Sequence, residues 1–271
     1  MKTILVNAQN LQDTYLQASP CVMALGYFDG VHLGHQHVIK MAREEAKKRG
    51  LPLALMSFSP HPINILSGGK RHIPCLTALA EKKEILKGLG VDIFYIVDFT
   101  LEFAALTPKQ FVEAYLVKLG VVHAVAGFDF TYGAKGAGKL ADINNYSKNQ
   151  ISVTDVECVA YLGEKISSTA IRQRLHRADV HEIPFFLGRH YSVKMNWDGK
   201  QLEMLDQSML PNKGLYEVVL EHDYDEINAV VSVDDHGYIQ VIKTLGNLTE
   251  GIIKIHWLQS RGLRRLASNS F

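Results

Sequence analysis

Two histidines spaced three residues apart are the first candidates for chemistry in this sequence. His32 and His35 lie in the segment GYFDGVHLGH (26–35), which follows an apolar run and opens a helix-like pattern. At the N-terminus of a helix both imidazoles can face one bound anion, because the helix dipole and the free N–H groups favour a phosphate there. Metal binding is less favoured, because the histidine spacing is i, i+3 and no Cys or acidic cluster joins the pair. The alternative interpretation is a pair of surface histidines on an amphipathic helix.

Glycines flank these histidines. Gly26 and Gly34 would let the backbone come close to a ligand, and Asp29–Gly30 is a tight-turn pair. A glycine-containing turn between a strand and a helix, with histidines at the helix start, indicates a phosphate-binding loop.

A second candidate phosphate site lies in KISSTAIRQRL (165–175). Ser168 or Thr169 can cap the predicted helix, and Arg172 lies one turn inside it. Hydroxyl groups, free N–H groups and an arginine fork can together bind phosphate oxygens. The alternative is an ordinary capped helix with a solvated arginine.

A loop after a later strand adds candidates for ring binding. In GFDFTYGAKGAGK (127–139), Asp129 is expected at the carboxyl end of the sheet. Phe128, Phe130 and Tyr132 supply either a stacking wall for a planar ring or part of the core.

The loop after the second predicted strand is stiffened by prolines. In SFSPHPINIL (57–66), Pro60 and Pro62 hold a non-helical backbone. His61, between them, could contact a substrate or merely cap a turn.

The elements that must position these residues alternate along the first two-thirds of the chain. Apolar runs predict buried strands at 21–28, 51–58, 91–99, 121–130 and 151–160, and helical periodicity predicts helices at 35–48, 77–90 and 107–118. Strands buried on both faces and separated by helices indicate a parallel sheet in an α/β fold. Ligands of such sheets bind beyond the carboxyl ends of the strands, where the candidate segments lie.

Helix ends are marked in the same region. Gly50 and Gly90 are plausible C-caps, and Thr107, Pro108 and Gln110 form an N-terminal capping signal. In the helix at 35–48 the expected buried face comprises Val38, Ile39, Ala42 and Ala46.

The pattern changes after about residue 184. Six short strand-like runs separated by turn residues indicate a smaller all-β barrel-like domain. We therefore expect an N-terminal domain at 1–184 and a C-terminal domain at 185–271. The runs are YSVKMNW, QLEML, GLYEVVLEH, INAVVSV, YIQVIKTL and GIIKIHWL.

The composition is that of a nearly neutral globular protein. The 271 residues carry a formal charge of +1, with 47% hydrophobic and 21% charged residues, so no basic field indicates nucleic-acid binding. Three separated cysteines argue for a reducing cytosol and against a disulfide framework or zinc. Because no apolar stretch approaches membrane-spanning length, we expect a cytoplasmic protein without a membrane partner. The sequence does not give the oligomeric state.

Several motifs together resemble one family. GYFDGVHLGH, SFSPHP, GVDIFYIVDFT, GFDFTYG and ISSTAIR, in this order, are similar to the FAD synthetase module of the bacterial bifunctional riboflavin kinase/FAD synthetases. The resemblance covers about residues 15–190. It implies a Rossmann-like HxGH nucleotidylyltransferase domain with ATP and FMN as substrates and Mg²⁺ as cofactor.

The resemblance also implies roles for individual residues. His32, His35 and Arg172 would be catalytic, the histidines contacting the ATP phosphates. Asp129 would lie near the reacting phosphate and Mg²⁺. The implied ATP-binding residues are Gly26, Phe28, Asp29, Gly30, Gly34, Ser168 and Thr169. The implied residues near the flavin or adenine are Phe58, Pro60, His61, Asp129 and Phe130.

The C-terminal half departs from the family pattern. The family's riboflavin kinase barrel carries a Pro-Thr-x-Asn loop that binds ATP and magnesium. Here the only proline after Pro184 is Pro211, and Asn212 follows it. We therefore expect a degenerate kinase-like barrel without riboflavin kinase activity.

The implied reaction joins the AMP of ATP to FMN and releases pyrophosphate. The FMN phosphate is largely ionised near neutral pH, so alignment and charge stabilisation would supply the catalysis rather than a strong base. Two alternatives stay open: transfer to another phosphate ester, and a non-catalytic regulator that binds flavin nucleotides.

Overall fold

The computed structural model describes residues 1–223 and 225–261. The chain divides into two compact units. The first comprises Met1–Ile73 and Leu79–Ala160, and the second comprises Pro74–Ala78 and Tyr161–Phe271. The predicted boundary between residues 184 and 185 separates two expected functional domains, and it stays a prediction.

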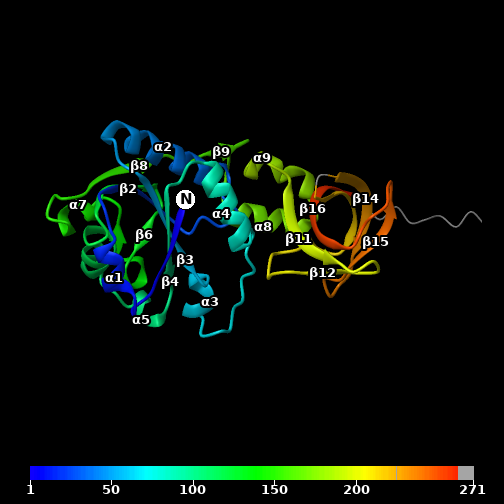
Figure 1. Ribbon diagram of the computed structural model, residues 1–271, viewed down its shortest axis with the longest axis horizontal. Coiled ribbons are helices and arrows are strands. Elements are labelled where there is room, and N and C mark those ends of the chain that lie inside the picture. The colour runs from blue at the N-terminus through cyan, green and yellow to red at the C-terminus, as the bar shows by residue number, and fades with distance from the viewer. Residues whose placement is uncertain (224, 262–271) are drawn as a thin grey trace, which may run out of the picture. The chain divides into compact units, whose positions relative to one another are not determined.

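Within the described residues, the first unit is built on a six-stranded parallel sheet (Figure 1). Its strands, in spatial order, are β1 (Lys2–Val6), β4 (Ile93–Asp98), β3 (Leu53–Ser59), β2 (Cys21–Leu25), β5 (Val121–Gly127) and β8 (Ser152–Val156). This confirms the predicted α/β fold. The edge strand β1, which pairs in parallel with β4, was not predicted.

Helices cover both faces of this sheet, and each face has its own apolar core. One core contains the buried side of α2 (Leu33–Arg49) and Leu86 of α4 (Leu79–Gly88). The other contains Phe111, Tyr115 and Ile143. The remaining helical segments of this unit are α1 (Leu11–Leu16), α3 (Pro62–Leu66), α5 (Leu101–Ala104), α6 (Pro108–Phe111), the π-helical Val112–Val117, the 3-10 turn Ala134–Gly136 and α7 (Asp142–Tyr146).

The predicted helix at 35–48 is confirmed. Its four expected core residues are the buried residues of α2, and Gly50 ends the helix at φ +64°. The predicted helix at 107–118 begins as expected, with a complete capping box between Thr107 and Gln110. The helical segment extends to Val117 as predicted, but Val112–Val117 forms π-helical turns, which the sequence analysis did not predict.

The second unit contains a closed antiparallel barrel in its described residues, which confirms the six predicted strand runs. The barrel order is β11 (Tyr191–Trp197), β12 (Leu202–Met204), β15 (Ile239–Thr244), β14 (Asp225–Val233), β13 (Gly214–His222) and β16 (Gly251–Arg261). Tyr191, Tyr216 and Trp257 fill its interior. Helical segments α8 (Ser168–Arg177), Val180–Glu182 and α9 (Pro184–Leu187) precede it.

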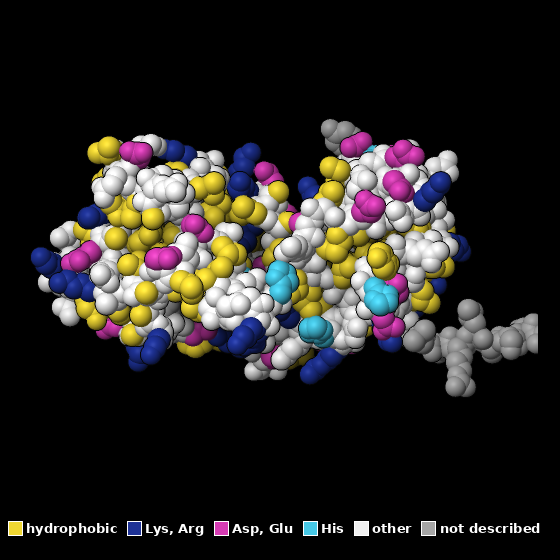
Figure 2. All heavy atoms as spheres, turned by 90° about the horizontal axis from the view of Figure 1, so that it is seen from below, with side chains coloured by type: hydrophobic (Ala, Val, Ile, Leu, Met, Phe, Trp, Pro, Cys, Tyr) yellow, Lys and Arg dark blue, Asp and Glu magenta, His cyan; other side chains and the backbone are white. Residues whose placement is uncertain are grey.

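Short hairpins join the larger elements. β6 (Thr131–Tyr132) pairs with β7 (Gly138–Lys139), and β9 (Ala160–Tyr161) pairs with β10 (Glu164–Lys165). In the described part of the chain, no helix combines the length and apolar character needed to cross a membrane. Figure 2 shows basic and acidic side chains interspersed over the visible face, as a near-neutral formal charge implies.

Candidate active site

The HxGH segment follows a strand in the interior of the sheet. β2 is fully buried and lies between β3 and β5. The connection through α2 leads to β3 on one side of β2, whereas β5 lies on the other side. Strand order therefore reverses at β2, and the carboxyl end of a strand at such a reversal is where α/β sheets bind ligands.

The turn between β2 and α2 is strained and buried. Phe28 and Val31 have positive φ angles of 54° and 43°, and Gly30 has φ 80°. A β-branched residue rarely adopts this conformation, and each such non-glycine residue costs about 1–3 kcal/mol. The packing of Phe28 and Val31, which are 1% and 0% exposed, holds the turn in place. Such strain typically collects at ligand-binding turns.

His32 caps the helix that carries His35. The His32 Nδ1 accepts a hydrogen bond from the His35 backbone N–H at 3.2 Å. Because Nδ1 is the acceptor, the neutral ring carries its proton on Nε2, which makes that nitrogen a donor. The two rings stack with centroids 3.6 Å apart. The predicted pair at a helix N-terminus is thus present, and His32 is buried rather than on the surface.

His35 is held in its neutral form. Burial is the largest cause that lowers the pKa of His35 well below its ordinary value, and electrostatic interactions with His32 and then with Lys82 lower it further. Its Nδ1 is buried and makes no hydrogen bond within residues 1–223 and 225–261. A buried polar atom in this condition points to a ligand or an ordered water as its partner.

Lys82 is a site residue that the sequence analysis missed. Its Nζ donates to the Tyr27 carbonyl at 3.3 Å and lies 5.0 Å from the centre of the Tyr27 ring. The available signal was its position four residues before Leu86 on the buried face of α4, where an amphipathic helix carries an apolar residue.

His61 caps a short helix. Its Nδ1 accepts the backbone N–H of Ile63 at 3.1 Å at the start of α3, so His61 caps this helix, while its predicted contact with the substrate stays a prediction. The His61 ring also packs edge-on against Tyr27, with centroids 4.5 Å apart. The proline loop therefore contacts the turn that leads to the histidines.

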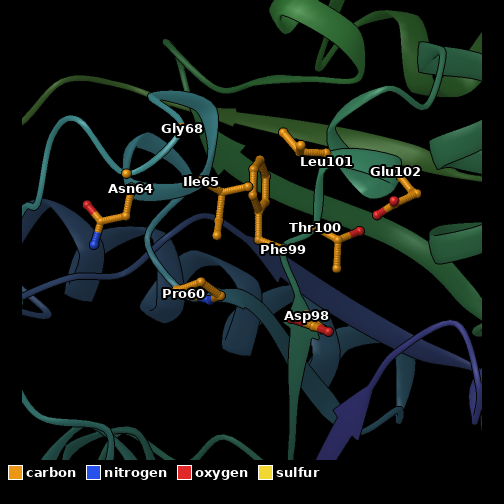
Figure 3. Close-up of a pocket in the computed structure, with 10 residues that line it drawn as sticks. Pro60, Asn64, Ile65, Gly68, Asp98, Phe99, Thr100, Leu101 and Glu102 are labelled. Atoms are coloured by element: carbon orange, nitrogen blue, oxygen red, sulfur yellow. The ribbon is translucent and has the colours of Figure 1, made fainter.

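A cavity of about 480 Å³ opens at the carboxyl ends of β3 and β4 (Figure 3). Figure 3 shows Asn64 and Ile65 of α3 on one side and Leu101 and Glu102 on the other. Its lining residues are Pro60, Asn64, Ile65, Gly68, Gly69, Asp98, Phe99, Thr100, Leu101 and Glu102.

Of the residues predicted near the flavin, Pro60 lines this cavity and Phe58 does not. Phe58 instead packs edge-on against Phe99, with the centroids of the two rings 6.0 Å apart. Phe99, the last residue of the strand predicted at 91–99, and Leu101, two residues later, also line the cavity and were not predicted.

The loop after β5 places the other candidates at the same edge of the sheet. Asp129 is exposed just beyond β5, where it was predicted. Tyr132 is a core residue, Phe130 is partly buried and stacks on Tyr132 at 5.9 Å, and Phe128 is half exposed. No group of three His, Cys, Asp or Glu side chains suited to a metal ion occurs among the described residues. Asp129 could therefore offer Mg²⁺ a single carboxylate beside the phosphates of a nucleotide.

The prediction that Ser168 or Thr169 caps the second helix was wrong. Ser167 is the N-cap of α8, and its Oγ accepts the Ala170 N–H at 3.1 Å. Ser168 and Thr169 instead form the first turn. Ser167 has the extended backbone that a cap requires, whereas the next two residues are already helical.

Arg172 is half-buried, and its Nη2 donates to the Pro74 carbonyl at 3.3 Å, so it is not a fully solvated arginine. Arg172 and the first turn of α8 belong to the second unit, whereas the histidines belong to the first.

A parallel sheet with two stacked histidines at the N-terminus of the helix after β2 defines the class: an α/β nucleotidyltransferase with a Rossmann-like domain. The family model for FAD synthetase matches residues 15–170. The chain belongs to the FAD synthetase family, and the reaction of that family is the transfer of AMP from ATP to FMN.

Known relatives agree with this membership. A bifunctional riboflavin kinase/FMN adenylyltransferase of Listeria monocytogenes is 39% identical, over 80% of this chain and 73% of the relative. The Bacillus subtilis protein of the same name is 38% identical, over 78% and 71%. A FAD synthetase of Listeria monocytogenes is 31% identical, over 87% and 90%.

The fold is also similar to that of a solved structure. A crystal structure described as a macrolide-efflux protein from Streptococcus pneumoniae superimposes with a TM-score of 0.83 at 29% sequence identity. The match covers 96% of this chain and 91% of that one.

Proposed function

We propose that this chain makes FAD from FMN and ATP at the N-terminus of α2, with His32 and His35 as the residues that stabilise the transferring phosphoryl group. The stacked pair at the start of the helix, in which burial lowers the pKa of His35 and favours its neutral form, is the observation that carries this assignment. Imidazole donors and the N-terminus of a helix can both bind phosphate oxygens.

The chemistry is a substitution at the α-phosphorus of ATP. A phosphate oxygen of FMN forms the new bond, the bond from the α-phosphorus to the bridging oxygen breaks, and pyrophosphate leaves. The Nε2–H of His32 donates to an oxygen on which charge develops. For Ser168, Thr169 and Arg172 of α8 the proposal keeps a phosphate-binding role, which hydroxyl groups and an arginine fork can fill.

Magnesium, when bound to the phosphates of ATP, neutralises part of their charge. Its protein ligand in this proposal is Asp129, whose exposed carboxylate follows β5. Phosphate oxygens and water would complete its coordination, as Mg²⁺ usually requires. The loop Gly26–Gly34 shapes the nucleotide site.

The cavity beside Pro60 supports a position for the flavin ring. Phe99 and Leu101 give it an apolar wall at the sheet edge that also carries the histidine turn. We expect Leu101→Ala, which changes a 62% exposed side chain, to raise the KM for FMN about fivefold without changing Tm, since about 1 kcal/mol of apolar contact is lost. Leu16→Ala on α1, at 85% exposure, is the matched control. An unchanged KM for FMN in Leu101→Ala would place the ring elsewhere.

The second part of the proposal is that riboflavin kinase activity is absent. The connection from β12 to β13 carries Pro211–Asn212, and the sequence contains no Pro-Thr-x-Asn. Riboflavin supplied with ATP and magnesium should therefore stay unphosphorylated, and FMN formed from it would refute this part.

The adenylyl-transfer assignment is tested at His35. We expect His35→Ala to lower the turnover for FAD formation by roughly 10²–10³-fold. Near-normal FAD production by this variant would contradict the assignment. Tight FMN binding by the unaltered protein without pyrophosphate release would favour a non-catalytic regulator. Transfer of AMP to a different phosphate ester, and not to FMN, would favour a nucleotidylyltransferase with another acceptor.

A cytoplasmic location belongs to the same proposal. Within the described residues, Cys21 and Cys158 are free thiols, as a reducing compartment would keep them.

A further inference from the structure

Lys82 is a buried basic residue beside the turn between β2 and α2, and the reaction scheme above gives it no role. Its side chain lies on the face of α4 that packs on the sheet, and the residue is 6% exposed. Removing an ammonium group from water costs several kcal/mol unless polar partners compensate. A lysine in this position therefore carries a cost that a leucine would not.

The Tyr27 carbonyl is the point at which Lys82 meets the active-site turn. It accepts hydrogen bonds from Lys82 Nζ at 3.3 Å and from Ser57 Oγ at 2.6 Å. Tyr27 immediately precedes the strained residue Phe28, whose ring lies 5.1 Å from that of His35. Lys82 and Ser57 thus fix the start of the turn that places the histidines.

The charge of Lys82 also reaches the histidines, since it is one of the causes that lower the pKa of His35. Neutral imidazoles can donate hydrogen bonds to a phosphate but bring no full positive charge. A triphosphate is strongly anionic, and a cation in a water-poor site attracts it far more than one in bulk water.

We propose that Lys82 is a positioning residue for adenylyl transfer: it orders the turn at Tyr27 and supplies the fixed positive charge that favours the ATP phosphates beside His32 and His35. This inference rests on the proposed function of the histidines. It gives α4, which connects the proline loop to β4, a direct role in nucleotide binding.

The test compares three substitutions at Lys82. Lys82→Met removes the charge and the donor, Lys82→Gln removes the charge but keeps a donor for Tyr27, and Lys82→Arg keeps the charge. We would measure binding of a non-hydrolysable ATP analogue and of FMN by calorimetry, together with Tm. Lys83→Met, the same charge change one residue along α4, is the matched control.

We expect both neutral variants to weaken binding of the ATP analogue roughly tenfold, which corresponds to about 1.4 kcal/mol. FMN affinity should stay within about twofold, and Lys82→Arg should recover most of the ATP affinity, since the charge is retained. If Lys82→Met fails to fold, Lys82→Gln decides the question.

Two results would overturn the inference. One is unchanged affinity for the ATP analogue in a folded neutral variant. The other is an equal loss of ATP and FMN affinity that Lys82→Arg does not restore, which indicates local packing alone. His35→Ala separates the two proposals. If it abolishes turnover while the neutral Lys82 variants bind the analogue normally, only the Lys82 inference fails.

Discussion

His32 has two separable tasks, one in the stability of α2 and one in catalysis. Its Nδ1 caps the helix by accepting the His35 N–H at 3.2 Å, and its Nε2 is the donor assigned to the phosphoryl group. Asparagine is among the best N-cap residues, but its short side chain cannot replace the imidazole donor. His32→Asn should therefore keep the helix cap and lose the chemistry, whereas His32→Ala should lose both.

The magnitudes follow from the structure. Loss of an N-cap costs about 1 kcal/mol, which lowers Tm by roughly 2–4 °C in a protein of this size. Loss of one electrostatic donor lowers turnover by roughly 10²–10³-fold. We expect His32→Ala to show both effects and His32→Asn to show the second with Tm within about 1 °C of the parent.

Thermal unfolding and FAD formation from FMN and ATP measure the two effects separately. If His32→Asn turned over near the parent rate, the His32 ring would have no catalytic task. If His32→Asn were as unstable as His32→Ala, the cap would not explain the position of His32.

Three further predictions concern pH, backbone conformation and the second helix. The pKa of His35 is lowered in the folded protein, so the stability contributed by its neutral form is present above its unfolded pKa, near 6.5, and is lost as the pH falls below that value. The urea midpoint of unfolding should therefore fall more between pH 7 and 5.5 in the parent than in His35→Gln. Equal falls in the two proteins would contradict this prediction. Gly120 has φ +75°, and a Cβ there would lie 2.6 Å from the Ser19 carbonyl oxygen, whereas at Gly163 φ is +81° and the space is open. Gly120→Ala should therefore lower the free energy of unfolding more than Gly163→Ala. Urea unfolding of both variants measures this, and equal losses would show that the clash is relieved. Ser167→Ala should lower stability by about 1 kcal/mol through the lost cap, whereas Thr169→Ala should weaken ATP binding with little change in stability, and the reverse pattern would restore Thr169 as the cap.

The sheet and the barrel could be predicted because their signals are local. The continuous apolar runs of β2 and β3 indicate strands buried on both faces, and the alternating runs after residue 184 indicate a barrel. β1 was not predicted, since KTILV is short and its edge position leaves Leu5 exposed. The π-helical turns at 112–117 contain no glycine or proline that would signal a departure from α-helical geometry, and Val112, Tyr115 and Leu116 within them are buried in the core.

The candidate site was predictable where glycines and a helix start mark it, as at His32 and His35. It was not predictable where the fold assembles it from distant segments. Lys82 meets Tyr27 across 55 positions of sequence, and only the structure shows that α4 lies beside the turn. Phe99 became a cavity residue because β4 is adjacent to β3, a neighbour relation that hydrophobic periodicity does not give.

Isotope transfer tests the central claim most directly. The protein would be incubated with magnesium and ATP labelled either at the α- or at the γ-phosphate, with FMN or riboflavin as the flavin. We predict that the α-label appears in FAD when FMN is supplied, that the γ-label appears only in pyrophosphate, and that riboflavin acquires neither label. Absence of α-label in FAD would contradict adenylyl transfer, and γ-label in FMN formed from riboflavin would contradict the loss of the kinase activity.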